Sequence, residues 1–287
     1  MPEGDTLFRT ARTLSRALTG TTITEFRTQL APLARWNDER PVAGQTVDRV
    51  EARGKWLLMF FSGGGVLLTH LRMNGSWHIY RRGERWRQPG RNMRIVLENA
   101  SWQAVGFSVP VAEVLSLSQI ERDHRIPRPE IDVLRPEFDT VAAAARIRAR
   151  SSEAIADVLL DQTVLAGVGN EFKSEICFAC AVNPFAPIAS LSDAHIAEIV
   201  GTALRMVREN ILEDSDETTV TYRGLGRRTR HASDPRERVW VYGRAGETCR
   251  KCGTLIERQL QGRDARVTFW CPQCQPISSD QAMQVRR

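Results

Sequence analysis

The sequence predicts an α+β protein with several domains. An N-terminal helix and β-sandwich come first, followed by a C-terminal helical domain that ends in a four-cysteine zinc hairpin. Three observations indicate this order. Apolar residues alternate in short runs early in the chain, recur at helical spacing further on, and give way to paired cysteines near the end. The length of 287 residues also favours two domains over one.

The N-terminal domain is predicted to span residues 1–118. It begins with a helix over residues 3–18, which has a regular apolar face and acids in its first turn. Short strand-forming runs follow, separated by turn residues, and this pattern is typical of a β-sandwich. The expected strands cover residues 46–52, 56–61, 66–71, 93–98 and 102–107.

A linker and a helical domain are expected next. Residues 119–138 are rich in charge and contain three prolines, which indicates a linker. Residues 139–245 are interpreted as the helical domain. Ser192, near the centre of this domain, is expected to cap the start of one of its helices. The other two expected helices cover residues 154–165 and 171–181. The stretches without periodicity are residues 214–238, interpreted as a mobile loop, and residues 277–287, interpreted as a disordered tail.

Arginine supplies nearly all of the positive charge. The chain has 40 lysines and arginines against 34 acids, a formal net charge of +6, and its only lysines are Lys55, Lys173 and Lys251. Guanidinium groups suit phosphates and base edges, so the composition is compatible with a nucleic-acid partner. A genome that favours arginine codons explains the bias equally well.

The sequence carries no signal for export or membrane insertion. No run of eighteen apolar residues occurs, and Glu3 and Asp5 stand where a signal peptide needs basic residues. We therefore expect a cytoplasmic protein without a membrane partner.

Two C-x2-C pairs near the C-terminus have the spacing of a structural zinc site. Cys249 and Cys252 are separated by eighteen residues from Cys271 and Cys274. Two such turns bring four thiolates to one tetrahedral ion, and a site closed by four thiolates is structural. We expect one zinc ion per chain, in a zinc finger over residues 246–276. The alternative is four unligated cysteines, which the glycine and proline beside the pairs disfavour.

A third C-x2-C pair is interpreted differently. Cys177 and Cys180 lie in an apolar helical pattern without turn residues, so we expect small buried side chains and not metal ligands. Six cysteines in a chain without an export signal favour metal ligands or buried thiols over disulfides.

Residues 159–171 join two helices through a tight turn that contains Gly167 and Gly169. Glycines let the backbone approach a phosphate and expose N–H groups at the start of the next helix, where Asn170 can add a side-chain amide. Taken alone, this stretch is more often an ordinary helical hairpin than a phosphate site.

Pro2 and Glu3 form a candidate catalytic pair. A small residue after Met1 permits removal of the initiator methionine, which leaves the secondary amine of Pro2 at the chain start. An α-amino group titrates near about 8, so a fair fraction is nucleophilic at neutral pH. Such an amine can displace a base at a sugar C1′, and the resulting iminium promotes strand cleavage, with Glu3 as acid or base. Most starts of this kind are only helix beginnings with proline in the first turn.

Several motifs in order along the chain resemble one protein family. The motifs are MPEGDT at 1–6, RGK at 53–55, HLRMNG at 70–75, the stretch 159–171, WVYGR at 240–244 and the cysteine pairs with Phe269 and Trp270. The set is similar to that of formamidopyrimidine-DNA glycosylase and endonuclease VIII over residues 2–276. The PEGD start is closer to the endonuclease VIII branch, including its actinobacterial members. The resemblance implies a helix–two-turn–helix domain in the C-terminal half.

The resemblance implies a catalytic group of four residues. Pro2 is the nucleophile and Glu3 the general acid. Lys55, at the start of a strand, contacts a phosphate next to the lesion, and Arg266 reaches a phosphate from the zinc hairpin. The alternative for Lys55, judged on the residues alone, is a solvated charge at the start of a strand.

The resemblance also implies further DNA contacts. Asn170 contacts a phosphate from the helix–two-turn–helix domain. Met73, with Arg72 beside it, lies in the loop that fills the gap left by a flipped nucleotide. The alternative for Met73 is a core residue.

The implied function is a bifunctional DNA glycosylase and abasic-site lyase of base excision repair that cleaves the strand by β,δ-elimination. Oxidised pyrimidines are the expected lesions and oxidised purines the runner-up. The expected partner is damaged double-stranded DNA, with single-stranded or bubble DNA also open, bound by a monomer. Two alternatives remain: a lyase that excises no base, and a zinc-finger DNA-binding protein without catalysis, which has no need of Pro2 and Glu3.

Overall fold

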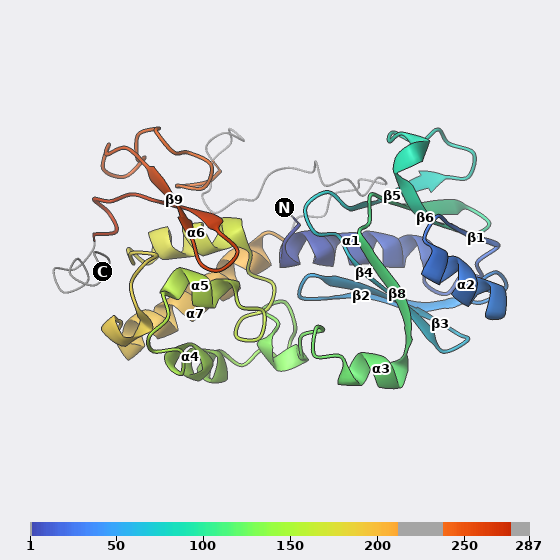
Figure 1. The fold of residues 1–287 in the computed structure, drawn as a ribbon, viewed down its shortest axis with the longest axis horizontal. Coiled ribbons are helices and arrows are strands. Elements are labelled where there is room, and N and C mark those ends of the chain that lie inside the picture. Colours follow the sequence, from blue (N-terminus) through green and yellow to red (C-terminus); the bar gives the residue numbers. More distant parts are fainter. Residues whose placement is uncertain (1, 212–237, 277–287) are drawn as a thin grey trace. The chain divides into compact units, whose positions relative to one another are not determined.

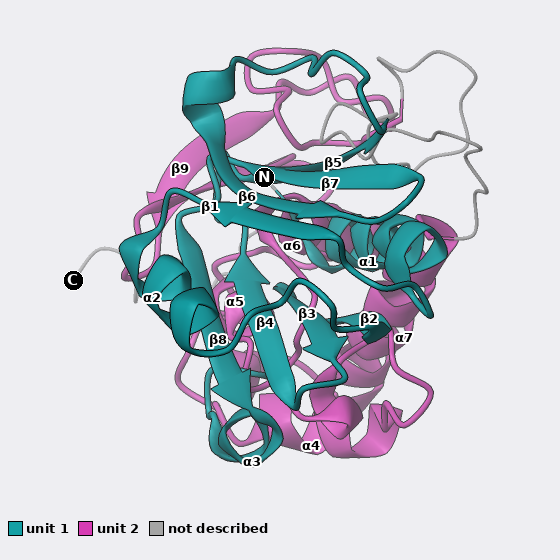
Figure 2. Ribbon diagram, turned by 90° about the vertical axis from the view of Figure 1, so that its right-hand side faces the viewer, with its two compact units in different colours: residues 1–127, 213–224 teal, residues 128–212, 225–287 magenta. Residues whose placement is uncertain are grey.

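The computed structural model describes residues 2–211 and 238–276, which form two compact units. Figure 2 draws the first unit in teal and the second in magenta. The division falls between Pro127 and Arg128, inside the stretch expected to be a linker. The expected loop 214–238, apart from its last residue, and the expected tail 277–287 lie outside the described residues.

The first unit is a β-sandwich of two four-stranded antiparallel sheets, as the sequence predicts. The strand orders are β2-β3-β4-β8 and β1-β6-β7-β5. Figure 1 labels these strands except β7, and Figure 2 labels all eight. The strands are β1 (Glu25–Thr28), β2 (Val47–Arg53), β3 (Trp56–Phe61), β4 (Gly65–His70), β5 (Ser76–Arg81), β6 (Met93–Glu98), β7 (Trp102–Phe107) and β8 (Val111–Ser116). Strands β3, β6 and β7 have the expected bounds, and β2 and β4 are each shifted by one residue along the chain.

Four elements of this unit lack a clear pattern in the sequence. Strands β1 and β8 are sheet edges in which no residue is fully buried, so neither carries the run of buried apolar residues that marks the central strands. Strand β5 carries a buried His78 where a strand pattern calls for an apolar residue. Helix α2 (Ala31–Glu39) buries only Leu33 and lies in a region interpreted as strands.

Helix α1 (Gly4–Leu18) supplies part of the sandwich core. Its apolar face is buried as expected, and Asp5 in the first turn and Arg16 in the last suit the helix dipole. Leu7 and Leu14 share one core with Leu57 of one sheet and Ile95 of the other, so α1 packs against both sheets. The N-terminus of the chain is thereby fixed to the edge of the sandwich core.

Helix α3 (Leu117–Arg122) covers the outer face of the sheet β2-β3-β4-β8. Its Ile120, together with Ile126, packs on Leu58, Phe60 and Val66. Part of the stretch expected to be a linker is therefore structured and belongs to the first unit.

The second unit packs four helices around one apolar core. They are α4 (Thr140–Arg148), α5 (Ile155–Leu160), α6 (Asn170–Ala179) and α7 (Asp193–Glu209). Ser192 caps α7 as predicted, because its hydroxyl accepts the N–H of His195 at 3.2 Å. The expected helix 154–165 is too long. It ends at Leu160, because the side chain of Asp161 accepts the N–H of Thr163 and closes a turn there.

The unit ends in a hairpin of β9 (Glu257–Gln261) and β10 (Arg266–Trp270). Both strands lie between the two cysteine pairs, within the expected zinc finger 246–276. Among the described residues, no helix is long and apolar enough to cross a membrane.

Candidate functional site

The start of α1 buries two carboxylates beside Pro2. Glu3 is the N-cap of the helix, with an extended backbone, and its carbonyl accepts the N–H of Leu7 at 3.1 Å. Glu3 is 1% exposed, and Asp5, for which the sequence suggested no role, is fully buried. A proline and a buried carboxylate are therefore adjacent and held by the helix. This juxtaposition suits nucleophilic attack coupled to proton transfer.

Lys55, His70 and Arg72 lie close together at one end of the sheet β2-β3-β4-β8. Lys55 follows Gly54, whose φ of +55° makes the turn between β2 and β3, and His70 ends β4 opposite Trp56. The Nδ1 of His70 accepts the N–H of Arg72 at 3.0 Å. Burial, and then the charges of Lys55 and Arg72, lower the pKa of His70 to about 4. At neutral pH this ring is uncharged, with its proton on Nε2.

The loop 71–75, between β4 and β5, presents Met73 to solvent. Met73 is 55% exposed, so the alternative of a core residue is wrong. The loop is tight: Arg72 has φ +45°, and a Cβ at Gly75 would lie 2.7 Å from the carbonyl oxygen of Leu71. An apolar side chain held outward on a short, fixed loop has the form of a wedge between base steps.

In the second unit, Asn170 begins α6 and contacts the hairpin. Its side-chain amide donates to the carbonyl of Val267 in β10 at 2.9 Å, and its buried Oδ1 has no hydrogen-bond partner among the described residues. Gln162 holds the preceding turn, because its amide donates to the carbonyl of Val168 and accepts the N–H of Gly167. The turn and the Asn170 amide are therefore fixed by the protein itself.

Arg266 is the first residue of β10 and precedes the residue that Asn170 contacts. Its guanidinium is 3.7 Å from the carboxylate of Asp264, which is itself 76% exposed, so this ion pair is accessible to water and weak. Asn170 and Arg266, two of the three residues expected to contact phosphate, thus lie on adjacent elements. Lys55, the third, belongs to the first unit.

Four cysteines of the hairpin region come together with the geometry of a metal site. The Sγ atoms of Cys249, Cys252, Cys271 and Cys274 all lie within 4.8 Å of one another. The closest pairs are Cys252 with Cys271 at 3.4 Å and Cys249 with Cys274 at 3.9 Å. Zinc–sulfur bonds of about 2.3 Å place tetrahedral ligands about 3.8 Å apart, so this cluster fits one ion.

Cys177 and Cys180 stand apart from this cluster, as predicted. Both are buried in the helical core. Burial raises the pKa of Cys177 to about 12, against a smaller opposing effect of the Lys173 charge, so its thiol stays protonated and is a poor metal ligand.

Buried polar side chains of α6 attach the hairpin and the segment 240–242 to the helical core. Lys173, fully buried, donates to Thr268 Oγ1 at 2.7 Å, and Thr268 donates to Gln261 at 2.7 Å. Glu175, also fully buried, accepts the three backbone N–H groups of 240–242 at 2.8 to 2.9 Å. Sequence analysis gave neither residue a role, and the scarcity of lysine was the only signal for Lys173.

This combination of β-sandwich, buried Pro2-Glu3 start, helical unit and four-cysteine hairpin defines a class of DNA-repair glycosylases. The family model described as the formamidopyrimidine-DNA glycosylase N-terminal domain matches residues 1–108. The model for the H2TH domain of the same enzymes, the helix–two-turn–helix domain, matches residues 130–222. The chain belongs to the formamidopyrimidine-DNA glycosylase and endonuclease 8 family of DNA glycosylases and abasic-site lyases.

Relatives of similar length match along almost the whole chain. The probable endonuclease 8 2 of Streptomyces coelicolor is 36% identical over 96% of this chain and 94% of its own length. The DNA-(apurinic or apyrimidinic site) lyase Nei2 of Mycolicibacterium smegmatis is 38% identical over 97% of this chain and all of its own. The endonuclease 8 of Salmonella newport is 31% identical. These relatives agree with the expected endonuclease VIII branch.

Solved structures share the fold. The formamidopyrimidine-DNA glycosylase of Lactococcus lactis, solved with DNA that contains an abasic site, has a TM-score of 0.77 over 96% of this chain and all of its own, at 21% identity. MutM in complex with DNA that contains carbocyclic 8-oxo-G has a TM-score of 0.76, with the same coverage, at 20% identity.

Proposed function

We propose that the chain is a bifunctional DNA glycosylase and abasic-site lyase of base excision repair, with the Pro2 amine as its nucleophile. The observation that carries this proposal is the buried pair Pro2 and Glu3 at the start of α1. The pair lies within the residues that match the glycosylase domain. A protein that only bound DNA would have no use for a carboxylate buried beside an N-terminal proline.

The chemistry follows from a secondary amine beside a carboxylic acid. The Pro2 amine attacks C1′, the bond to the damaged base breaks, and Glu3 gives a proton to the leaving group. The Pro2 nitrogen loses its proton, and the C1′–O4′ bond then breaks with a proton going to O4′, so the sugar ring opens and an iminium forms. The iminium acidifies C2′–H, so loss of that proton breaks the C3′–O bond, and a second elimination breaks C5′–O. Hydrolysis of the iminium then frees the amine.

Lys55, Asn170 and Arg266 bind the phosphates next to the lesion. Each offers an N–H donor on a fixed element, which positions DNA without reading its sequence. Met73, with Arg72 beside it, enters the space left by the flipped nucleotide. His70 can add a neutral N–H donor beside Lys55, because its Nδ1 is already an acceptor.

One zinc ion per chain, bound by the four hairpin cysteines, is part of the proposal. The donor set suits zinc because four thiolates prefer this ion and leave no open position for water. Zinc supplies no step of the reaction and only fixes the hairpin that carries Arg266.

Damaged double-stranded DNA bound by a monomer is the proposed substrate complex, with single-stranded and bubble DNA as further substrates to test. Oxidised pyrimidines are the proposed lesions, because the resemblance to the endonuclease VIII branch implies them and relatives named endonuclease 8 match the chain. Oxidised purines are the second choice, because several structures of similar fold hold DNA with purine lesions.

A lyase that acts only on preformed abasic sites is the second candidate function. It is favoured by one relative, the Mycolicibacterium smegmatis protein named for that activity. The two candidates differ in base excision and agree on the Pro2 amine.

Borohydride trapping tests the nucleophile. A protein whose Pro2 amine is free should form a covalent adduct with an abasic duplex when borohydride is added. A variant with two extra residues before Pro2 should form none. Adducts with duplexes that carry one intact oxidised base would establish excision and rank the lesions. Equal trapping by the extended variant would exclude Pro2 and make Lys55 the next amine to test.

A further inference from the structure

An arginine-rich connection between β5 and β6 lies outside the site described above. This connection, residues 82–92, is called here the arginine loop; it carries four arginines and a single acid, Glu84. It follows β5 at the end opposite to loop 71–75, which bears Met73. A strand of six residues spans about 20 Å, so the arginine loop is beyond reach of a nucleotide flipped beside Met73.

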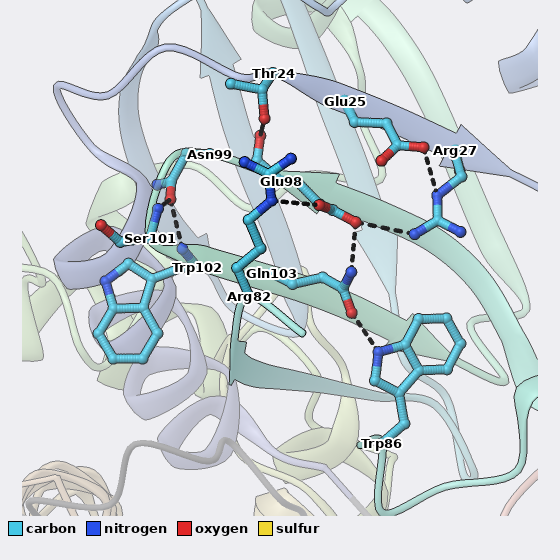
Figure 3. Close-up of polar contacts among 10 residues, drawn as sticks. All are labelled: Thr24, Glu25, Arg27, Arg82, Trp86, Glu98, Asn99, Ser101, Trp102 and Gln103. Carbon is cyan, nitrogen blue, oxygen red and sulfur yellow. Dashed lines mark hydrogen bonds and ion pairs between the residues drawn. The ribbon is translucent and has the colours of Figure 1, made fainter. Parts of the chain in front are cut away.

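The arginine loop is anchored to the sheet by a buried polar network, shown in Figure 3. The indole N–H of Trp86 donates to the side-chain carbonyl of Gln103, whose amide donates to the carboxylate of Glu98. Glu98, almost fully buried, also accepts from Arg27 at 2.9 Å and lies 3.8 Å from Arg82. The buried carboxylate thus has donors on several sides, and the chain of bonds ends on the loop.

A second anchor acts at the next residue. The backbone N–H of Arg87 donates to the hydroxyl of Tyr80 at 3.1 Å, and this hydroxyl lies 2.9 Å from Nδ1 of the buried His78. The ring of Trp86 also packs edge-on against Phe107, with centroids 5.5 Å apart. Two consecutive loop residues are therefore fixed, although the loop lies on the surface.

Most of the charge of the arginine loop has no acidic partner among the described residues. Arg82 pairs with Glu98, and the carboxylate of Glu84 accepts the N–H of Arg81 at 2.9 Å. Arg85, Arg87 and Arg91 are exposed, and none has an acidic partner among the described residues. Arg85 and Arg87 line a surface hollow of about 640 Å³ formed by residues 84–90, and Arg91 is the next residue along the chain.

We infer that the arginine loop is a second contact for the phosphate backbone of duplex DNA, about 20 Å along β5 from the loop that bears Met73. A fixed backbone with three unpaired guanidinium groups binds phosphates at a small cost in entropy and does not distinguish sequences. The inference rests on the proposed function only in that the ligand is DNA. Its effect is to hold undamaged flanks and to lengthen the footprint, and it has no part in excision.

The test is a salt titration of binding to an undamaged duplex of about 30 base pairs and to a duplex of about 8 base pairs that contains an abasic site. On the long duplex, the variant R85Q/R87Q/R91Q should lower the slope of log affinity against log salt by about 0.9 per lost contact, and by up to about 2.7 in total. Affinity near 0.1 M salt should fall by at least about tenfold. The short duplex, centred on an abasic site, should be bound and trapped as well as by the unaltered chain.

Two matched variants separate this contact from general charge. R35Q/R40Q/R122Q removes three exposed arginines from α2, its C-cap and α3, and should leave the slope on the long duplex unchanged. R85K/R87K/R91K keeps the charge and should restore most of the slope. The inference is overturned if R85Q/R87Q/R91Q has the same salt slope as the control variant on the long duplex. It is also overturned if R85Q/R87Q/R91Q loses as much affinity on the short duplex as on the long one. Loss of trapping by the unaltered chain would contradict the proposed function and leave the salt measurement on undamaged DNA intact.

Discussion

The two units hold their candidate DNA-contacting residues in different ways. In the first unit, Lys55, Arg72 and Met73 lie on short turns at the ends of strands, and Met73 is more than half exposed. In the second unit, Asn170 is buried and hydrogen-bonded to the hairpin, and Lys173, further along the same helix, is fully buried. Replacement of a turn residue should therefore change function with little effect on folding, whereas changes around the hairpin should affect both.

The largest effect is expected from the metal cluster, because there function depends on folding most directly. Chelation, or Cys249→Ser with Cys252→Ser, should remove the ion and disorganise the hairpin that carries Arg266. Structural zinc binds with about 10 kcal/mol or more of apparent free energy, so DNA affinity should be lost at every salt concentration. Elemental analysis should find one zinc per chain before the change and none after it.

The control for this experiment is Cys177→Ser with Cys180→Ser. These side chains lie in the helical core, away from the cluster, so the metal content should stay at one ion even if stability falls. Loss of zinc from the control variant would show that the wrong four cysteines were chosen.

Glu3→Gln tests the opposite case, a change of chemistry without a change of fold. The amide has the shape of the carboxylic acid but cannot transfer a proton, so excision of an oxidised base should slow by about 10² to 10⁴. Cleavage at a preformed abasic site should be partly retained, since no base has to leave. Single-turnover rates on the two substrates measure this split, and full excision by the variant would remove Glu3 from the mechanism.

His78 of the first unit is a buried titratable group that supports the sheet. Burial, and then the charge of Arg87, lower its pKa to about 4 in the folded chain, below the usual value of 6.5. The unfolded chain therefore binds the proton more readily, and stability should fall as pH drops from about 6.5 to about 4, by up to about 3 kcal/mol. The pKa of His70 is lowered in the same way, so His70 adds a further loss of stability over the same pH range.

Urea unfolding at a series of pH values checks this expectation. His78→Phe cannot be protonated, so its stability should depend less on pH in this window, whatever its stability at neutral pH. An unchanged pH dependence would show that His78 titrates normally in the folded chain.

Local patterns predicted much of this molecule, and long-range contacts account for what they missed. The spacing of the cysteines and the apolar stripe of α1 are properties of the chain itself, so the metal cluster and the first helix were predictable. His70 and Glu175 acquire their surroundings only through tertiary packing, since their neighbours come from other elements. Edge strands such as β1 and β8 left no periodic signal because both faces are partly exposed.

The smallest effect is expected for Arg266→Ala. This change also tests the difference between the two units most directly. Arg266 is partly exposed on the hairpin, and its ion pair with Asp264 is weak, so it resembles the turn residues of the first unit more than its buried neighbours. Its loss should leave the zinc content unchanged, because Arg266 is not one of the four clustered cysteines, and should change stability little, because its side chain is partly exposed. If it contacts one phosphate, the salt slope should fall by about 0.9 on lesion-bearing and undamaged duplexes alike, and the ranking of lesions should stay the same. Lys55→Ala is the matched change in the first unit and should give a similar slope. A variant of Arg266 that kept both slopes but changed the preferred lesion would place this arginine in the base pocket and contradict its role as a phosphate anchor.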